Sequence, residues 1–329
     1  MRSFAQFGND LYTGKLSFNF VGRRAIWYAI AVILIVGSVL GTVVKGGFAF
    51  GIEFTGGSQF TVSNVTDQDQ TIAQNAVTEA VPGTISRIAI IGGDTVRVQT
   101  DQLTNRESDD VRDSLARAYG VNSSDVDASF VGATWGQDIT SSAIRALIIF
   151  LVLAGVVMAI YFRTWKMSLA AMIALLHDLI ITAGVYGVFG FEVTPAAMIG
   201  FLTILGYSLY DTVVVFDKIR ENTSEDGGGK TRTFSESVNL AVNQTLVRSI
   251  NTSVVAILPV GSILFIGSVL LGAGTLRDIA LALFIGMLVG TYSTIFIAAP
   301  VYAHLRSSEP ELKKHAERIK ASRSESVVS

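Results

Sequence analysis

The chain has 329 residues, of which half are hydrophobic and 16% are charged, and its formal net charge at pH 7 is −2. This composition is typical of a membrane protein that crosses the bilayer several times, and it excludes an ordinary soluble domain. The near-neutral charge argues against nucleic-acid binding, and the absence of cysteine excludes disulfides and thiolate metal sites. The three histidines, His177, His304 and His315, are too scattered to build a metal centre, so the sequence predicts neither a metal nor a cofactor.

Six apolar segments are long enough to span a membrane, because about 20 apolar residues cross the hydrocarbon core. The first is too long for a signal-peptide core and is followed by no clear cleavage site, so we expect an uncleaved anchor. The predicted fold is an α-helical polytopic membrane protein with transmembrane helices at residues 25–44, 143–162, 167–189, 195–216, 249–271 and 276–305.

Lysine and arginine predict the orientation of the chain, because cytoplasmic segments carry an excess of these residues. With the N-terminus inside the cell, the inner segments carry 17 of the 25 basic residues. The sequence therefore predicts a multi-pass protein of the cell membrane with both termini cytoplasmic. The predicted cytoplasmic segments are 1–24, 163–166, 217–248 and 306–329.

Residues 45–140 are expected on the outer side of the membrane as a small α+β domain, the outer domain. Alternating apolar residues, a GGD turn signal and stretches with helical spacing give the order β-α-β-β-α-β. This order is that of a ferredoxin-like domain. The segments that carry it are 53–63, 69–81, 84–91, 95–100, 107–120 and 125–134.

The loop after the fourth span contains GGGKT at residues 227–231, which suggests a nucleotide-binding P-loop. A P-loop needs a glycine five residues before the Gly-Lys pair, and this chain has Ser224 there. A flexible loop is therefore the favoured interpretation.

Asp211 lies in an otherwise apolar span. An aspartate at the centre of a span costs ~2.5–3.5 kcal/mol on insertion scales, so such residues usually face the bundle interior and serve a function. Tyr207 and Ser208 lie four and three residues before Asp211 and share its helix face. The three residues form a polar stripe on an apolar helix.

Other polar residues accompany Asp211. Asp178 lies about halfway along the third span, and Arg248 lies at the inner entrance of the fifth. Thr212 and Asp217 are supporting candidates, with Asp217 at the inner boundary. His177 precedes Asp178, but adjacent residues on a helix point to different faces. We therefore expect a packed histidine there.

Two interpretations of Asp211 follow from the residues alone. In a proton relay, the buried carboxyl takes a proton on one side and, by moving relative to Arg248, releases it on the other. In the alternative, Asp211 hydrogen-bonds to neighbouring helices and only holds the bundle together. The residues leave both interpretations open.

Glycine pairs at the spacing of one helical turn occur in two spans. Gly37 and Gly41 lie in the first span, and Gly286 and Gly290 lie in the sixth. Small residues at this spacing let helices approach closely. We therefore predict close helix contacts at both pairs.

Five motifs occur in order along nearly the whole chain: FGIEFTGGSQ, HDLIITAGVY, GYSLYDTVVVFDKIREN, NQTLVRSINTS and GTYSTIFIAAPV. Together they resemble the SecF branch of the SecD/SecF family of bacterial protein-export proteins. This family belongs to the resistance-nodulation-division superfamily. Glu53, Tyr210 and Lys218 stand where family members often have Asp, Asn and Arg.

The resemblance implies a role for the chain and for its charged residues. Asp211 corresponds to a membrane aspartate implicated in proton movement, and Arg248 corresponds to the basic residue that works with it. The chain would be a non-enzymatic accessory subunit that uses the proton motive force to promote preprotein export through the SecYEG channel. Superfamily members usually have twelve spans in two halves, so a partner half, SecD, is implied.

Three alternative functions compete with this interpretation. A superfamily exporter of lipids or small molecules usually has two large outer domains, whereas the loop between the third and fourth spans is only GFEVT. A structural assembly factor that conducts no protons stays open. An intramembrane aspartyl enzyme built from Asp178 and Asp211 would lack any catalytic signature.

Overall fold

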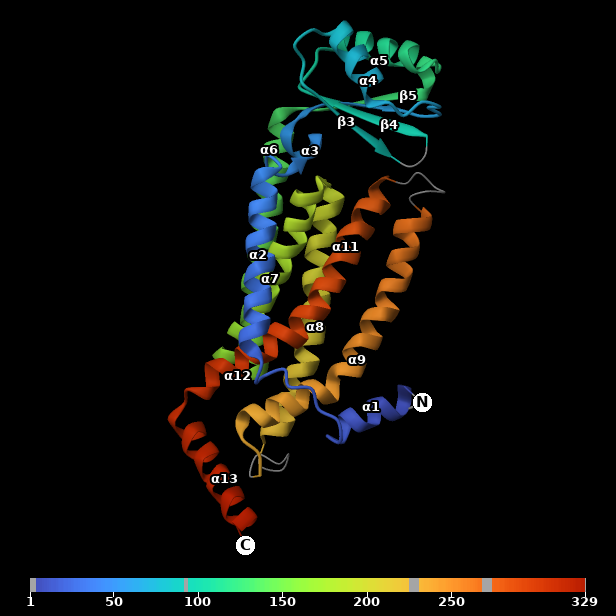
Figure 1. Ribbon diagram of the computed structural model, residues 1–329. Helices are drawn as coiled ribbons and strands as arrows, with labels where there is room; N and C mark the ends of the chain where they lie inside the picture. The colour runs from blue at the N-terminus through green and yellow to red at the C-terminus, as the bar shows by residue number, and fades with distance from the viewer. Residues whose placement is uncertain (1–3, 92–93, 225–230, 268–273, 329) are drawn as a thin grey trace.

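A computed structural model describes residues 4–91, 94–224, 231–267 and 274–328 of the chain. Within these ranges, six helices are long and apolar enough to cross a membrane. The polytopic helical fold is therefore confirmed. The helices form one bundle, with the outer domain at one end and both chain ends at the other, which we call the inner end (Figure 1). The GGG and lysine of the GGGKT segment lie outside the described residues.

Most of the spanning helices begin before the predicted spans, because an apolar pattern marks only the part of a helix that meets lipid. The helix predicted at 143–162 begins at Ala133, before the end of the predicted outer domain. The helices are α2 (Arg24–Val44), α6 (Ala133–Phe162), α7 (Trp165–Phe189), α8 (Pro195–Thr223), α9 (Phe234–Ser262) and α11 (Gly274–Ser293). Shorter helices at the inner end are α1 (Phe4–Tyr12), α12 (Ala299–Ser307) and α13 (Pro310–Val328).

Much of the polar segment predicted at 217–248 is helical. Helix α8 continues to Thr223 and α9 already begins at Phe234. A capping box starts α9: the Thr233 hydroxyl accepts from the Glu236 N–H, and the Glu236 carboxylate accepts from the Thr233 N–H at 2.9 Å. Such a box satisfies two free N–H groups at a helix start, so this end of α9 is well defined without an apolar run.

Two π-helical turns interrupt the spanning helices. Turn η3 (Ile263–Gly267) follows α9, and turn η4 (Thr294–Ala298) joins α11 to α12. Pro300 follows η4 and has no N–H for the carbonyl of Phe296 four residues earlier. Turns of this kind occur frequently at functional sites.

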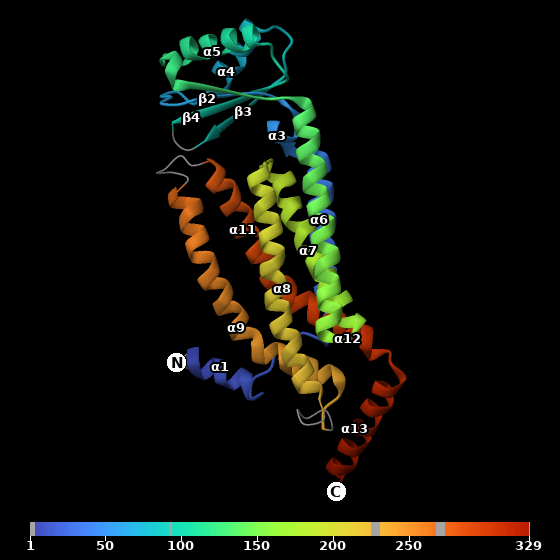
Figure 2. The same ribbon diagram turned by 180° about the vertical axis from the view of Figure 1, so that it is seen from behind.

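The outer domain has a four-stranded sheet in the order β3-β4-β2-β5, with each neighbouring pair antiparallel. This arrangement is consistent with the ferredoxin-like pattern. Helices α4 and α5 cover the face of the sheet that points away from the bundle (Figure 2). The elements are β2 (Gly57–Val62), α4 (Gln70–Ala80), β3 (Ser86–Ile91), β4 (Thr95–Thr100), α5 (Asn105–Tyr119) and β5 (Val126–Val131).

The core of the outer domain lies between the sheet and its helices. Phe60, Val96, Val98 and Leu115 are fully buried there. The first strand of this sheet, β2, begins at Gly57 and not at residue 53 as predicted. Residues Ile52–Thr55 form a short helix, α3, instead. Burial of these apolar side chains is the main stabilising contribution to the domain.

The start of helix α5 gives a pH-dependent contribution to stability. Glu107 accepts a hydrogen bond from the Thr104 N–H at 2.8 Å, and this bond holds the pKa of the exposed Glu107 carboxyl below its ordinary value of 4.5. A lowered folded-state pKa stabilises the fold above the ordinary pKa, and the contribution is lost as the pH falls through the folded pKa. We therefore expect Glu107→Ala to lower the melting temperature at pH 7, and the difference from wild type to shrink in acid.

Thermal unfolding of the full chain, followed by circular dichroism from pH 7 down to pH 3, measures this difference. Glu79→Ala is the matched control, because Glu79 lies on α4 and is exposed. A difference between wild type and Glu107→Ala that grows with acidity would contradict the prediction.

Polar contacts fix the outer domain to the bundle. Strand β1 (Ala49–Phe50) pairs in parallel with β6 (Glu192–Val193), which lies in the short connection between α7 and α8. Arg97 of β4 forms an ion pair with Glu192 at 2.7 Å, with both side chains less than a fifth exposed. Gln99 donates to the other oxygen of Glu192. The sheet is therefore tied directly to two spanning helices.

Removal of Arg97 is expected to loosen this connection. Arg97→Met leaves Glu192 without its charged partner, so the short β1–β6 pairing loses its support. We expect faster hydrogen exchange at Gly51, whose N–H donates to the Val193 carbonyl at 3.0 Å. Arg87→Met, an exposed arginine on the neighbouring strand, is the control. Equal exchange rates at Gly51 in the wild type and Arg97→Met would contradict the prediction.

Candidate functional site

A layer of buried polar side chains crosses the middle of the bundle and joins four helices, α7, α8, α9 and α11 with its turn η4. Each member is less than 10% exposed, although the surrounding side chains are apolar. Buried polar groups need hydrogen-bond partners, and these residues supply them to each other. The members are His177, Asp178, Ser208, Asp211, Thr212, Ser249, Ser253 and Thr294.

Asp178 lies at one side of the layer. One of its carboxylate oxygens accepts a hydrogen bond from the Ser208 hydroxyl at 2.5 Å. The other lies 3.3 Å from Nδ1 of His177. Gly290 of α11 packs against the pair, because a Cβ at that position would lie 3.2 Å from Cβ of Ser208. The close approach predicted at Gly290 is therefore confirmed. In the first span the prediction holds at Gly41, which packs against Val188, but is wrong at Gly37, where an added Cβ would meet nothing within 4 Å among the described residues.

Asp211 lies in the same layer on α8, and it is 4% exposed. Its Oδ1 accepts a hydrogen bond from the Ser249 hydroxyl at 2.9 Å. Its Oδ2 is buried and has no hydrogen-bond partner among the described residues. One carboxyl oxygen is thus held in place, and the other faces no donor from the described residues.

Hydroxyl pairs continue the layer on both sides of Asp211. Thr212 and Thr294 lie 3.1 Å apart through their hydroxyl oxygens. Tyr207 reaches the Ser253 hydroxyl at 3.5 Å, and Ser253 in turn lies 2.6 Å from the Thr291 hydroxyl. The polar stripe predicted on α8 therefore contacts α7 and α9, and the adjacent Thr212 contacts η4.

Arg248 does not contact Asp211 in this conformation. Its side chain is exposed, and in the described parts of the chain no ion pair joins it to a carboxylate, although it lies near enough to act on Asp211 electrostatically. Successive residues of an α-helix point about 100° apart. Ser249 faces the bundle and Arg248 consequently points away from it.

Asp217 lies outside the buried layer. It is partly exposed toward the inner end of α8 and accepts a hydrogen bond from the Tyr161 hydroxyl of α6 at 2.9 Å. The structure therefore places Asp217, like Arg248, apart from the other five predicted site residues.

His177 belongs to the layer, which its position beside Asp178 did not predict. It is 4% exposed, and its Nε2 has no partner within the described ranges. Tyr292 of α11 faces it with ring centroids 6.0 Å apart, and the buried Tyr292 hydroxyl is likewise unpaired in the part of the chain described. These two atoms can therefore form further hydrogen bonds at this end of the layer.

Metal ligation is not indicated by the layer. Among the described residues, no group of three or more histidine, aspartate or glutamate side chains lies close enough together to hold a metal ion. The chemistry that these residues offer is the acceptance, donation and transfer of protons between carboxyl, hydroxyl and imidazole groups.

Comparison with known proteins places this layer in a family context. The family described as protein export membrane protein SecD/SecF, C-terminal, matches residues 111–308, which include every member of the layer. The chain belongs to the SecD/SecF family.

Individual relatives agree with this family. The protein translocase subunit SecF of Streptomyces coelicolor is 42% identical over 329 residues, all of this chain and 87% of that protein. The same-named protein of Mycobacterium tuberculosis H37Rv is 40% identical over 323 residues, 95% of this chain and 72% of that protein. The protein translocase subunit SecDF of Thermus thermophilus is 32% identical over 86% of this chain.

Solved structures give the same result for the fold. The crystal structure of SecDF, a translocon-associated membrane protein from Thermus thermophilus, superposes with a TM-score of 0.75 at 29% identity. A SecDF in super-membrane-facing form superposes with a TM-score of 0.63 at 28% identity. The superposed regions include 89% and 94% of this chain, respectively. They include only 39% and 40% of the longer SecDF chains.

One departure from the usual family sequence lies beside the layer without entering it. Tyr210, where many SecD/SecF members have Asn, is 57% exposed and points away from Asp211. The side chain therefore changes the surface of α8 and leaves the hydrogen bonds of the layer unaffected.

Proposed function

We propose that this chain is a proton-driven accessory subunit of the Sec protein translocase, which works with a SecD half to promote preprotein export. Family membership and the relatives named translocase subunits support the export role. The observation that carries the proton-driven part is Asp211, a carboxyl buried in a membrane helix with one oxygen bonded to Ser249 and the other free of donors from the described chain.

The proton is carried at Oδ2 of Asp211. The Ser249 hydrogen bond fixes Oδ1, so Oδ2 is the atom open to a proton from the outer half of the bundle. Arg248 lies one residue from Ser249 on α9, and a guanidinium that approaches a carboxylate favours its ionised form. A movement of α9 that brings Arg248 toward Asp211 then releases the proton toward the inner end.

The rest of the layer converts this charge change into helix movement. A neutral carboxyl tolerates an apolar neighbourhood, whereas an ionised one demands donors. Asp178 holds α8 through Ser208, and Thr212 holds η4 through Thr294. Tyr207 adds a contact to α9. A proton on Asp211 therefore biases how α8 packs against three neighbours.

The partner and the orientation are parts of the same proposal. Transporters of this kind couple at the interface between related halves, and six spans form one half. The relative SecDF of Thermus thermophilus is longer, since this chain covers 38% of it, so a separate SecD chain would supply the remainder. The outer domain faces the preprotein that emerges from SecYEG, and both termini are cytoplasmic. The role is non-enzymatic.

Reporter export in cells with and without this chain tests the proposal, with tagged SecD to follow assembly. We expect export of a secreted reporter to fall without the chain and SecD to co-purify with it. Unchanged export, with altered efflux of lipids or small molecules from the same cells, would overturn the proposal in favour of an exporter.

A further inference from the structure

His177 is a buried basic side chain that the proton step at Asp211 does not use. It lies on α7 with 4% of its surface exposed, directly before Asp178, which is 1% exposed. Nδ1 of His177 lies 3.3 Å from Oδ1 of Asp178, and no other basic side chain of the described residues forms an ion pair with that carboxylate. His177 is therefore the basic partner of a buried acid.

The hydrogen bonds of Asp178 determine which nitrogen of His177 carries a hydrogen. Oδ2 of Asp178 accepts from the Ser208 hydroxyl at 2.5 Å, and Oδ1 faces Nδ1 of the imidazole ring. An ionised carboxylate only accepts hydrogen bonds, so Nδ1 is the donor. The hydrogen bond of one ring nitrogen sets the state of the other. Nε2 is therefore the position at which this ring gains or loses a proton.

Nε2 of His177 is buried and has no hydrogen-bond partner in the described part of the chain. Tyr292 of α11 faces the ring, α8 places Ser208 against the pair and carries Asp211 one turn further inward, and the apolar middles of α2 and α6 contain no charged side chain. Buried polar atoms almost always have partners, and an exception calls for an explanation such as a role in the chemistry. The unpaired lone pair of Nε2 is thus open to a proton.

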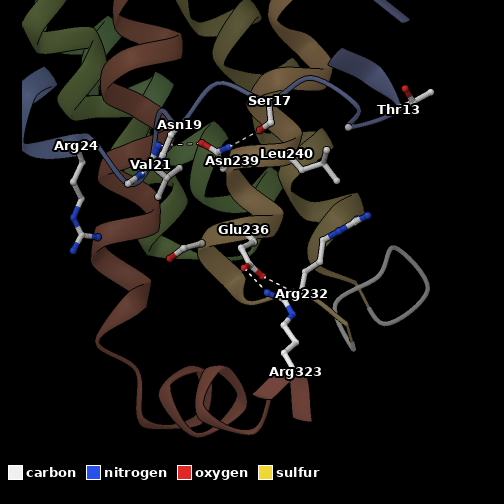
Figure 3. Close-up of a pocket in the computed structure, with 13 residues that line it drawn as sticks. Thr13, Ser17, Asn19, Val21, Arg24, Arg232, Glu236, Asn239, Leu240 and Arg323 are labelled. Atoms are coloured by element: carbon white, nitrogen blue, oxygen red, sulfur yellow. Dashed lines mark hydrogen bonds and ion pairs between the residues drawn. The ribbon is translucent and has the colours of Figure 1, made fainter. Parts of the chain in front are cut away.

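The pair of His177 and Asp178 lies on the outer side of Asp211. Ser208, which bonds to Asp178, precedes Asp211 by three residues on α8, which corresponds to ~4.5 Å along the helix. Helix α8 runs from the outer end toward the inner end (Figure 2). The open cavity at the inner end is walled by the segment before α2, the start of α9 and α13, and no residue of the buried layer lines it (Figure 3). The pair is therefore on the side from which the proposed proton enters.

We propose that His177 is a second proton-carrying residue of the relay, with Nε2 as the accepting atom and Asp178 as the residue that positions the ring. This inference rests on the proposed proton-driven function. The lone pair of Nε2 binds the proton and no other bond changes. The resulting imidazolium neutralises the charge of the Asp178 carboxylate, which is costly to keep unpaired in an apolar interior. Loss of the proton from the same nitrogen restores the neutral ring.

Nitrogen-15 NMR of the full chain with labelled histidine, in lipid nanodiscs, shows which ring nitrogen carries a hydrogen. The chain has three histidines, and the spectrum of His177→Asn identifies the His177 signals by their absence. We expect Nδ1 to be protonated at every pH at which the chain is folded, and Nε2 to be protonated in acid and unprotonated in alkali. A hydrogen that stays on Nε2, or a ring whose state does not change with pH, would overturn the proposal.

Export of the secreted reporter separates the proton from the hydrogen bond. Asparagine places its amide nitrogen near the position of Nδ1, so His177→Asn keeps a donor for Asp178 and removes Nε2. We expect export to fall to the level of cells that lack the chain, with normal membrane levels and normal SecD co-purification. His304→Asn, which replaces an exposed histidine of α12, is the control and should export as the wild type does.

The outcomes separate this proposal from the proposed function. Normal export in cells without the chain would count against the proposed function. Export that depends on the chain but is normal in His177→Asn would overturn the role of His177 alone and leave Asp211 as the proton carrier. The NMR spectra are recorded on the purified wild type, so they decide the state of His177 even where the variant does not fold.

Discussion

Asp211→Asn is expected to reduce export of a secreted reporter to the level of cells that lack the chain. Asparagine has the shape of aspartate, and its carbonyl oxygen can still accept the hydrogen bond that Ser249 gives to Asp211 at 2.9 Å. The amide cannot take up or release a proton at neutral pH. The packing of α8 against α9 is therefore kept while the proposed proton step is removed.

The measurement is reporter export from cells whose only copy carries the substitution, with membrane levels and SecD co-purification followed in parallel. Asp217→Asn is the matched control, because Asp217 lies on the same helix but bonds to Tyr161 outside the buried layer. We expect this control to export normally. Normal export by Asp211→Asn would instead mean that Asp211 only joins helices, and the chain would then be an assembly factor.

Gly286→Val is expected to destabilise the bundle by about 1–3 kcal/mol, the usual cost of overpacking a well-packed core. Helix α11 passes so close to α8 at this glycine that an added Cβ would lie 2.9 Å from Cγ2 of Ile204 and 3.0 Å from its Cβ. The helices must move apart, and the movement separates Gly290 from Ser208 and Asp178 one turn further along. We therefore expect export to fall together with the melting temperature.

Gly206→Ala is the control for this prediction. A Cβ on Gly206 of α8 would meet no atom of the described residues within 4 Å. Alanine is favoured over glycine in a helix interior by ~1 kcal/mol, so this variant should melt at or slightly above the wild-type temperature. Thermal unfolding in detergent compares the two. Equal melting temperatures of Gly286→Val and the wild type would contradict the prediction that α11 packs closely on α8 at this position.

Local sequence signals predicted the spans and the order of the outer domain, because both follow from hydrophobic periodicity. The beginning of α9 was missed, although its capping box, Thr233 and Glu236, is itself a local signal. The residues around this box are polar, and their composition favours a loop over a helix. The short helix α3 lies where the sequence predicted the first residues of a strand. An alternating pattern does not specify where a strand begins.

The sequence predicts which residues belong to the site better than it predicts which of them contact each other. Asp211, Asp178 and Ser208 could be selected because polar side chains are costly in an apolar span. Their partners could not, since Ser249 and Thr294 resemble many other hydroxyl residues in apolar helices. The pairing of Asp178 with Ser208 depends on how α7 and α8 rotate against each other. Only the tertiary packing determines that rotation.

The π-helical turn η4 has a geometric consequence for α11 and α12. From residue 293 to residue 300 every residue except Phe296 is buried, a run too long for one side of a regular α-helix. An inserted residue shifts the rotational phase of all that follows by about 100°. In a regular α-helix Thr294 and Tyr302 would point about 80° apart, whereas the shifted phase aligns them more closely, one toward Thr212 and the other toward Phe216 of α8. A single extra residue thus keeps α11 and α12 aligned on the same neighbouring helix, α8.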